Sequence, residues 1–258
     1  MKGAESGTGG THAFTQQPPA DLFCGAAPDF LSKGEQWVHY FAAVCGLKPD
    51  ERVVDVGCGS GRVAIPLSRY LAKGTYEGFD TGLREIEWCQ KHITPTAPNF
   101  RFAHANVYNL TYNPTGTIAP SEYEFPYPDA DFDFIVLTSV FTHMLPRDME
   151  HYFSEISRVL KPGGRWLATY FLLNPDSLSL IEAGTSAFDF RHDIGEYRVR
   201  DPDRHEDALA YPEDRVRALY ERFGFEISVD YGQWPGRDPS PTNRDGQDIV
   251  LARSKTAS

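Results

Sequence analysis

The sequence predicts an α/β fold with a doubly wound, mostly parallel seven-stranded sheet, helices on both faces and an antiparallel edge strand. Three observations predict it. Short runs of β-branched and apolar residues alternate with segments whose apolar residues recur at the period of a helix. A cluster of glycines follows the first of these runs, and the last two runs have no helical segment between them. Alternating strands and helices give a parallel sheet that is covered on both faces.

The first half of the chain supplies three strands. A helix is predicted over residues 34–45, where apolar residues lie three and four positions apart and Gly46 follows. Residues 52–56 (Arg-Val-Val-Asp-Val) are the first strand, because β-branched residues favour extended backbone. After the glycines, apolar residues one turn apart predict a helix over residues 63–71. The next elements expected are a strand at 75–79, a helix at 83–92 and a strand at 100–104.

The second half of the chain supplies the remaining four strands. Residues 132–138 are nearly all apolar, as in a strand that is buried on both faces. A strongly amphipathic helix follows over residues 149–160 and is ended by the turn Lys161-Pro-Gly-Gly164. The last elements expected are a strand at 165–171, a helix at 216–223 and strands at 225–229 and 249–252. These last two strands should form an antiparallel pair at the sheet's edge, because no helix separates them.

The chain divides into a tail and one domain. Residues 1–20 are rich in Gly, Thr, Ser, Gln and Pro without periodicity, which predicts a disordered tail before a domain over residues 21–258. Within the domain, residues 108–130 and 174–210 are too long to be simple connections. Long loops on a rigid α/β scaffold usually carry substrate-specific residues. We therefore expect residues 174–210, inserted after the fifth strand, to form a substrate lid.

Composition excludes several classes of function. The chain has 25 Lys plus Arg against 36 Asp plus Glu, a formal net charge of −11, which argues against nucleic acid and anionic membranes as partners. No apolar run is long enough to span a membrane, and the N-terminus lacks the apolar core of a signal peptide. The four cysteines stand at unrelated spacings: Cys24, Cys45, Cys58 and Cys89. They predict reduced thiols, three of them in the core, rather than disulfides or a zinc site, and hence a cytoplasmic protein.

The glycine cluster is the strongest functional signal. It reads Asp55-Val-Gly57-Cys-Gly59-Ser-Gly61 and lies between a predicted strand and a predicted helix. Glycines let the backbone approach a ligand closely, and ligands of open α/β sheets bind at the carboxyl ends of strands. A dinucleotide fingerprint would need a small residue where Arg62 stands, so the spacing disfavours the alternative of an NAD-dependent oxidoreductase. Asp55 can instead accept a hydrogen bond from an ammonium group.

This turn resembles the first motif of the class I S-adenosylmethionine-dependent methyltransferases, in particular those that act on small molecules. Further segments are similar to motifs of that family in the expected order: Gly78-Phe79-Asp80, Phe125-Pro-Tyr-Pro-Asp129 with Phe132-Asp133, and Arg158-Val-Leu-Lys-Pro-Gly-Gly164. The resemblance implies a Rossmann-like fold, S-adenosyl-L-methionine as cofactor and S-adenosyl-L-homocysteine as product. It makes residues 21–258 a class I methyltransferase domain.

The resemblance also implies a set of cofactor-binding residues: Asp55, Gly57, Cys58, Gly59, Gly61, Asp80, Asn106, Val107 and Thr138. The main chain of the first two glycines would flank the methionine part, and Asp80 would accept the two ribose hydroxyls. Asn106 stands where the family often has an acid that accepts from the adenine amino group. There are structural alternatives: the glycines serve only a tight turn, Asp80 caps a helix, and Asn106 caps a loop.

The methyl acceptor is expected above the loop after the fourth strand. His143 in that loop is the candidate general base, because a histidine with a pKa near about 6.5 can take a proton at neutral pH. The alternative is a histidine that only shapes the loop. The candidate substrate-binding residues are Phe141, Arg191, Tyr197 and Trp234. Arg191 belongs to a basic cluster that would either bind a carboxylate or phosphate or pair with the acidic residues between its members.

The sequence thus predicts an enzyme that transfers a methyl group to a small-molecule acceptor, an O-methyltransferase. The alternatives are N- or C-methylation on the same scaffold, and a non-catalytic S-adenosylmethionine-binding protein. No metal is expected, since no His and carboxylate residues with ligand spacing stand near the loop after the fourth strand. The sequence leaves the acceptor and the oligomeric state open.

Overall fold

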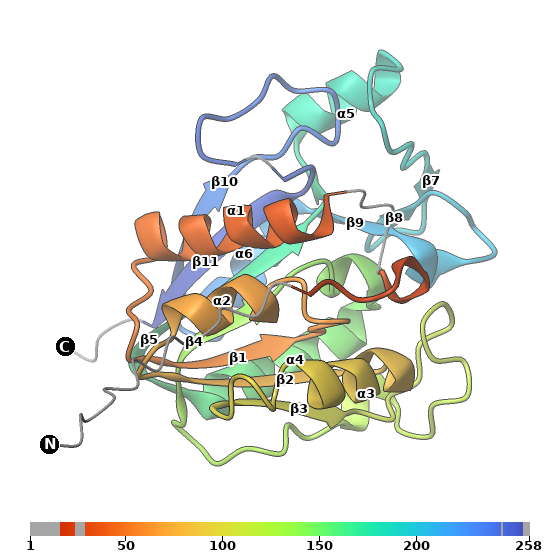
Figure 1. Ribbon diagram of the computed structural model, residues 1–258. Helices are drawn as coiled ribbons and strands as arrows, with labels where there is room; N and C mark the ends of the chain where they lie inside the picture. The colour runs from red at the N-terminus through yellow and green to blue at the C-terminus, as the bar shows by residue number, and fades with distance from the viewer. Residues whose placement is uncertain (1–15, 24–28, 244, 255–258) are drawn as a thin grey trace, which may run out of the picture.

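A computed structural model describes residues 16–23, 29–243 and 245–254, and Figure 1 shows its α/β architecture. Within these residues, seven strands form one sheet in the order β10-β11-β5-β4-β1-β2-β3. Their bounds along that order are Phe225–Asp230, Asp248–Ser254, Leu160–Tyr170, Phe132–Leu137, Arg52–Val56, Thr75–Asp80 and Phe100–His104. The predicted doubly wound fold is confirmed.

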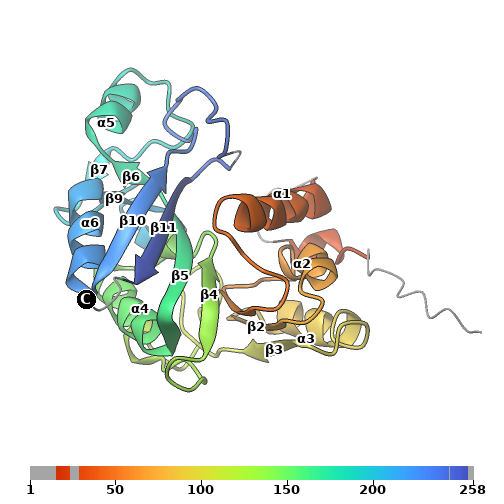
Figure 2. The same ribbon diagram turned by 90° about the vertical axis from the view of Figure 1, so that its left-hand side faces the viewer.

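The predicted antiparallel pair lies at one edge of this sheet. Strand β10 occupies the edge and runs antiparallel to β11, and β11 runs antiparallel to β5 as well. The strand that opposes the rest of the sheet is therefore β11, one place in from the edge (Figure 2). Its first residues consequently lie at the same end of the sheet as the last residues of β1, β2 and β4.

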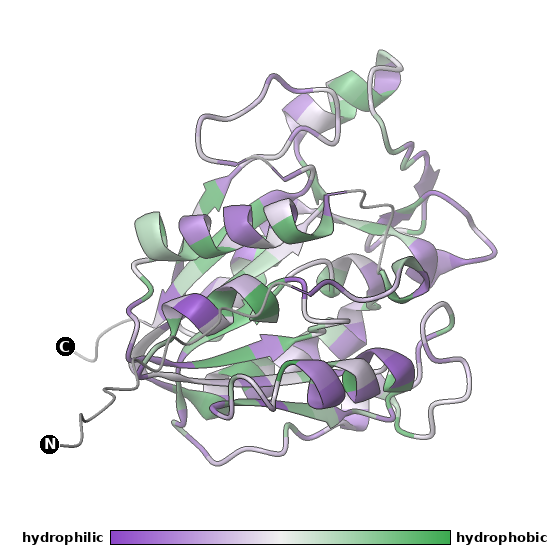
Figure 3. Ribbon diagram, viewed as in Figure 1, coloured by the Kyte–Doolittle hydropathy of each residue, from purple (hydrophilic) through white to green (hydrophobic). Residues whose placement is uncertain are grey.

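Helices cover both faces of the sheet. Figure 2 shows α1 (Phe30–Ala43), α2 (Ala64–Tyr70) and α3 (Leu83–His92) on one face and α4 (Pro146–Val159) and α6 (Glu213–Arg222) on the other. Successive side chains of a strand point to opposite faces. In β1 this sends Val53 into the core beneath the first three helices and Val54 and Val56 into the core beneath the other two. Hydrophobic residues accordingly line the interior of the molecule in Figure 3.

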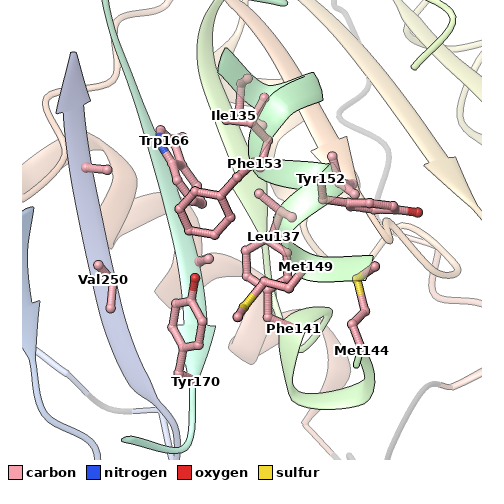
Figure 4. Close-up of a cluster of buried hydrophobic side chains, with 14 of the residues drawn as sticks. Ile135, Leu137, Phe141, Met144, Met149, Tyr152, Phe153, Trp166, Tyr170 and Val250 are labelled. Atoms are coloured by element: carbon pink, nitrogen blue, oxygen red, sulfur yellow. The ribbon is translucent and has the colours of Figure 1, made fainter. Parts of the chain in front are cut away.

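The core beneath α4 and α6 is strongly aromatic. Figure 4 shows Phe153 of α4 pointing toward Trp166 and Phe141. The ring centroid of Phe153 lies 4.9 Å from that of Trp166 and 4.8 Å from that of Tyr220, and all of these side chains are fully buried. Phe141, predicted to bind substrate, stacks on Phe153 and on Tyr170 within this core.

The fifth strand begins earlier than predicted. The expected turn Lys161-Pro-Gly-Gly164 lies inside β5 as a bulge, because Leu160 pairs with Phe132 and Arg165 already pairs with Phe134. Gly163 has a positive φ of 74°, which a bulge at this place accommodates.

The segment 174–210 is an insertion after the fifth strand, as expected, and it contains structure of its own. It holds α5 (Pro175–Glu182), β7 (His192–Asp193), β8 (Arg198–Val199) and the 3-10 turn η4 (His205–Asp207). With β6 (Leu172–Leu173) and β9 (Leu209–Pro212), its strands form a second, four-stranded sheet in the described residues. Strands of two residues carry no detectable periodicity, so the sequence could not predict this sheet.

Most of the predicted tail, residues 1–15, lies outside the described residues, and so does Cys24. Residues 16–20 lead into a 3-10 turn, η1 (Ala20–Leu22), which begins next to the predicted domain boundary. Leu22 is buried, and its carbonyl accepts a 2.7 Å hydrogen bond from Ser60 Oγ beside the glycine cluster. The other three cysteines are buried thiols. Over the residues that the structure describes, no helix is long and apolar enough to cross a membrane.

Candidate functional site

A cavity of about 550 Å³ opens at the carboxyl ends of β1, β2 and β4. Four loops and a helix meet there: the glycine turn after β1, the end of β2, the loops after β3 and β4, and α1. The insertion after β5 contributes Phe188, Asp207 and Ala208 to the wall. Parallel α/β sheets bind ligands at this end, where the strand order reverses between β1 and β4.

Position 57 of the glycine turn requires glycine for two reasons. Its φ of +76° is a conformation that other residues rarely adopt. A Cβ atom on Gly57 would also lie 2.6 Å from Val140 Cγ2, in the loop after β4. The amides of Gly57 and Cys58 donate to the Phe79 carbonyl at 2.8 and 3.1 Å, which ties the turn to the end of β2. The turn is therefore a tightly held wall of the cavity.

Asp55 presents an unsatisfied oxygen. Its side chain is buried, and Oδ2 accepts a 2.8 Å hydrogen bond from the Tyr76 hydroxyl. Oδ1 is buried and has no hydrogen-bond partner among the described residues. Burial raises the pKa of Asp55 to about 7, and the hydroxyl of Tyr76 opposes this rise. A buried carboxylate oxygen without a partner is costly, so a cationic donor in the cavity would stabilise it.

Asp80 joins the turn to the start of α3. Oδ2 accepts from the Gly59 amide at 2.7 Å, and Oδ1 accepts from the Gly82 amide at 2.8 Å. Burial raises the pKa of Asp80, although both amides favour the ionised form. Each carboxylate oxygen has a second lone pair, so Asp80, which also lines the cavity, can accept hydroxyl groups while it holds the loop.

Two predicted cofactor residues do not line the cavity. Gly61 packs against α3, where a Cβ atom would lie 2.6 Å from Ile93 Cδ1. The Asn106 side chain donates to Thr117 Oγ1 at 2.9 Å and so braces its own loop, which was the structural alternative. The other predicted cofactor residues do line it: Asp55, Gly57, Cys58, Gly59, Asp80, Val107 and Thr138.

His143 also lines the cavity, at the end of the 3-10 turn η3 (Phe141–His143). Its Nδ1 lies 2.9 Å from the Glu206 carbonyl oxygen. A carbonyl can only accept, so Nδ1 carries the proton and Nε2 has the lone pair. The Tyr112 hydroxyl lies 3.2 Å from Nε2. Burial lowers the pKa of His143, which keeps the ring neutral at neutral pH. The side chain has the protonation state that a general base needs.

None of the four predicted substrate-binding residues lines the cavity. Phe141 belongs to the aromatic core, and Trp234 is buried with its Nε1 donating to Asp248 Oδ2 at 2.7 Å. The Tyr197 hydroxyl lies 2.8 Å from His205 Nδ1. Arg191 forms an ion pair with Asp189 on the surface, as expected of a self-paired charged segment. The sequence of a lid does not distinguish a residue that faces a ligand from one of the same type that contacts another lid residue.

Most cavity residues outside the glycine turn and the ends of β1 and β2 were not predicted from the sequence. The missed residues include aromatic side chains from three segments and polar ones near β4 and β11: Phe30, Trp37, Tyr108, Tyr112, Phe171, Phe188, Ser139 and Gln247. A partial signal for the position of Gln247 was available, because it stands two residues before the strand predicted at 249–252, which was expected to run antiparallel to its neighbour. No group of three or more metal-ligating side chains is found among the residues that the structure describes.

The family model described as "Methyltransferase domain" matches residues 29–228. The chain belongs to this family. The predicted resemblance to class I S-adenosylmethionine-dependent methyltransferases is thereby confirmed, and the match extends through the cavity walls formed by α1, the glycine turn and the insertion.

Curated relatives of this methyltransferase-family chain differ in the atom they methylate. The chain is 27% identical over 158 residues to a fatty-acid O-methyltransferase of Mycolicibacterium smegmatis. The matched region covers 61% of this chain and 50% of that protein. This chain is 32% identical over 158 residues to a sterol 24-C-methyltransferase of Neurospora crassa, with coverages of 57% and 36%. The chain thus spans half of the first relative and about a third of the second.

The fold of this family member also matches solved structures. A SAM-dependent methyltransferase of Aquifex aeolicus superposes with a TM-score of 0.52 at 18% identity, covering 87% of this chain and 90% of that one. At this identity the match speaks for the fold alone.

Proposed function

We propose that this chain transfers a methyl group from S-adenosylmethionine to a hydroxyl oxygen of a small-molecule acceptor. The observation that carries the proposal is the pairing, in one cavity, of the unsatisfied Asp55 Oδ1 with the neutral, lone-pair-bearing Nε2 of His143. The first suits a cationic cofactor and the second suits an acceptor that must lose a proton.

The cofactor side is built from residues of β1 and β2. Asp55 Oδ1 would accept from the α-ammonium group, and Asp80 would accept the ribose hydroxyls with its remaining lone pairs. Gly57 lets the main chain approach the ligand. When bound, S-adenosylmethionine supplies a methyl group on a sulfonium, whose transfer leaves the neutral sulfide S-adenosylhomocysteine.

The acceptor side requires a proton acceptor only for certain substrates. An alcohol or phenol must lose its proton during methylation, whereas a carboxylate is already ionised at neutral pH. His143 Nε2 would take that proton once the acceptor hydroxyl replaces the Tyr112 hydroxyl as its hydrogen-bond donor. The resulting imidazolium keeps its Nδ1 hydrogen bond to the Glu206 carbonyl and is stabilised by the negative charge of Asp207. The base therefore favours hydroxyl acceptors over carboxylic acids such as the substrates named for the fatty-acid relative.

Product analysis tests the proposal. The purified chain is incubated with S-adenosylmethionine and each of four probes: 4-propylphenol, octan-1-ol, octanoic acid and 4-propylaniline. We expect mass spectrometry to find the methyl ether of the phenol or the alcohol. Methylation of the aniline alone would replace the proposal with N-methylation. Cofactor binding without acceptor-dependent conversion of these probes or of any member of a broad metabolite panel would replace it with a non-catalytic binding role.

A further inference from the structure

The loop after β4 is joined to the start of β11 by an unusual polar cluster. Ser139 has a φ of +59°, one of only two positive φ values of non-glycine residues in the described chain. Its amide donates to Thr169 Oγ1 at 2.7 Å. Ser139 Oγ and Thr169 Oγ1 then both donate to Gln247 Oε1, at 3.1 and 2.5 Å. A strained residue of this kind persists only where its surroundings hold it, and such strain gathers at functional sites.

These bonds occupy the oxygen of the Gln247 amide and leave its nitrogen available to a ligand in the cavity. Thr169 Oγ1 already accepts the Ser139 amide, so its own proton is available for Gln247 Oε1. With Oε1 occupied by two hydroxyl donors, the two N–H groups of Nε2 remain, and no partner for them is found among the described residues. Gln247 lines the same cavity as His143. The cavity wall therefore presents an oriented pair of donors.

Building on the proposed function, we propose that Gln247 Nε2 donates to the methyl acceptor and makes the site selective for oxygen over neutral nitrogen. A hydroxyl oxygen has two lone pairs, so it can accept from Gln247 with one and attack the methyl group with the other while His143 takes its proton. A neutral amine has a single lone pair, which the attack uses. Its N–H groups would face the N–H groups of Gln247 without a hydrogen bond.

The substitution Gln247→Glu tests the role of Gln247 as a donor to the acceptor separately from its structural hydrogen bonds with Ser139 and Thr169. A glutamate has the same shape and can still accept from Ser139 and Thr169, but it presents an acceptor instead of a donor to the cavity. A purely structural role therefore predicts little change. Gln36→Glu makes the same chemical change on the exposed face of α1 and is the matched control. If Gln247→Glu melts much earlier than the wild type, Gln247→Met, which removes the donors without adding charge, takes its place.

The experiment measures, by calorimetry, the dissociation constants of 4-propylphenol and 4-propylaniline from the S-adenosylhomocysteine complex. We expect the wild type and Gln36→Glu to prefer the phenol, and Gln247→Glu to shift the ratio toward the aniline by about fivefold or more. Gln247→Met should lose the preference without reversing it. S-adenosylhomocysteine affinity should be unchanged in Gln36→Glu.

A ratio that is the same in Gln247→Glu and in the wild type would overturn the inference. The proposed function fails differently, through the absence of any O-methylated product in the wild type, so product analysis and the binding ratio distinguish the two failures.

Discussion

At the scale of single residues, we expect Asp55 to make cofactor affinity depend on pH. Its ordinary pKa is near about 4, and burial raises it to about 7. Binding of an ammonium group favours the ionised carboxylate. Below pH 7, Asp55 is mostly protonated and must release its proton when the ligand binds. We expect the affinity for S-adenosylhomocysteine to rise by up to about tenfold per pH unit as pH increases toward 7, and to level off above it.

Calorimetry between pH 5.5 and 8.5 measures this dependence. Asp55→Asn is the matched variant: its amide can still accept from Tyr76, and it should bind weakly with no pH dependence in this range. A wild-type profile as flat as that of Asp55→Asn would contradict the assignment of the ammonium group to this residue.

The same shift has the opposite effect on the ligand-free fold. An acid whose folded pKa lies above its unfolded value binds more protons in the folded state between the two values. Asp55 therefore lowers the stability of the ligand-free chain as pH rises from about 4 to about 7. Asp55 therefore destabilises the ligand-free chain at neutral pH, and a bound cationic ligand would offset this destabilisation.

His143 is expected to control turnover rather than cofactor binding. His143→Ala removes the proton acceptor and should lower kcat for a hydroxyl probe by about a hundredfold or more, the usual contribution of general base catalysis. The dissociation constant of S-adenosylhomocysteine should stay near the wild-type value. In the wild type, kcat/KM should rise with pH through a pKa below about 6.5, because burial lowers the pKa of His143.

The control for this variant is His39→Ala, which removes an exposed histidine on α1 and should leave both quantities unchanged. Equal turnover in His143→Ala and His39→Ala would restrict His143 to shaping its loop.

At the scale of elements, two loops far apart in the sequence hold His143 in place. The Leu110 amide donates to Glu206 Oε2 at 3.0 Å, and Thr111 Oγ1 donates to Asp207 Oδ1 at 2.6 Å. The carbonyl of Glu206 in turn fixes the tautomer of His143. The loop after β3 and the insertion after β5 thus form one connected wall around His143.

Thr111→Val tests this connection by removing one of its hydrogen bonds. We expect faster amide hydrogen exchange in the loop after β3 and in η4, because local opening depends on the few contacts that hold such loops. Thr115→Val, which changes an exposed threonine of the same loop, is the control. Equal exchange in the two variants would show that the Thr111 hydroxyl does not couple the segments.

The sequence predicted the elements better than their contacts. The seven strands and the turn from Asp55 to Gly61 were predictable because periodicity and glycine spacing are local properties. The side-chain contacts of Gln247 were not, because they join it to Thr169, which lies 78 residues earlier in the chain. Phe141 shows the reverse case: it lies in the expected loop, but its side chain turns into the aromatic core (Figure 4).

At the scale of the whole molecule, the aromatic core beneath α4 carries a large share of the stability. Phe153 is fully buried and packs against Phe141, Trp166 and Tyr220. Phe153→Ala should lower the free energy of unfolding by about 3–5 kcal/mol, because truncating a buried aromatic ring loses its burial and leaves a cavity. Denaturant unfolding followed by fluorescence measures this.

Leu83→Ala provides the comparison, since Leu83 is 50% exposed at the start of α3. It should change the free energy of unfolding by about 0.5 kcal/mol or less. Similar losses in the two variants would mean that the core is not the main source of stability.

The position of β11 between β5 and β10 has a consequence for biosynthesis. Strands β5 and β10 both precede β11 in the chain, and β10 pairs with no other described strand, so this edge of the sheet can form only after residues 248–254 have been synthesised. Gln247 arrives with the same segment. The part of the cavity wall that Gln247 contributes is thus completed only when that strand inserts, after the glycine turn and the loop after β4 have already been synthesised.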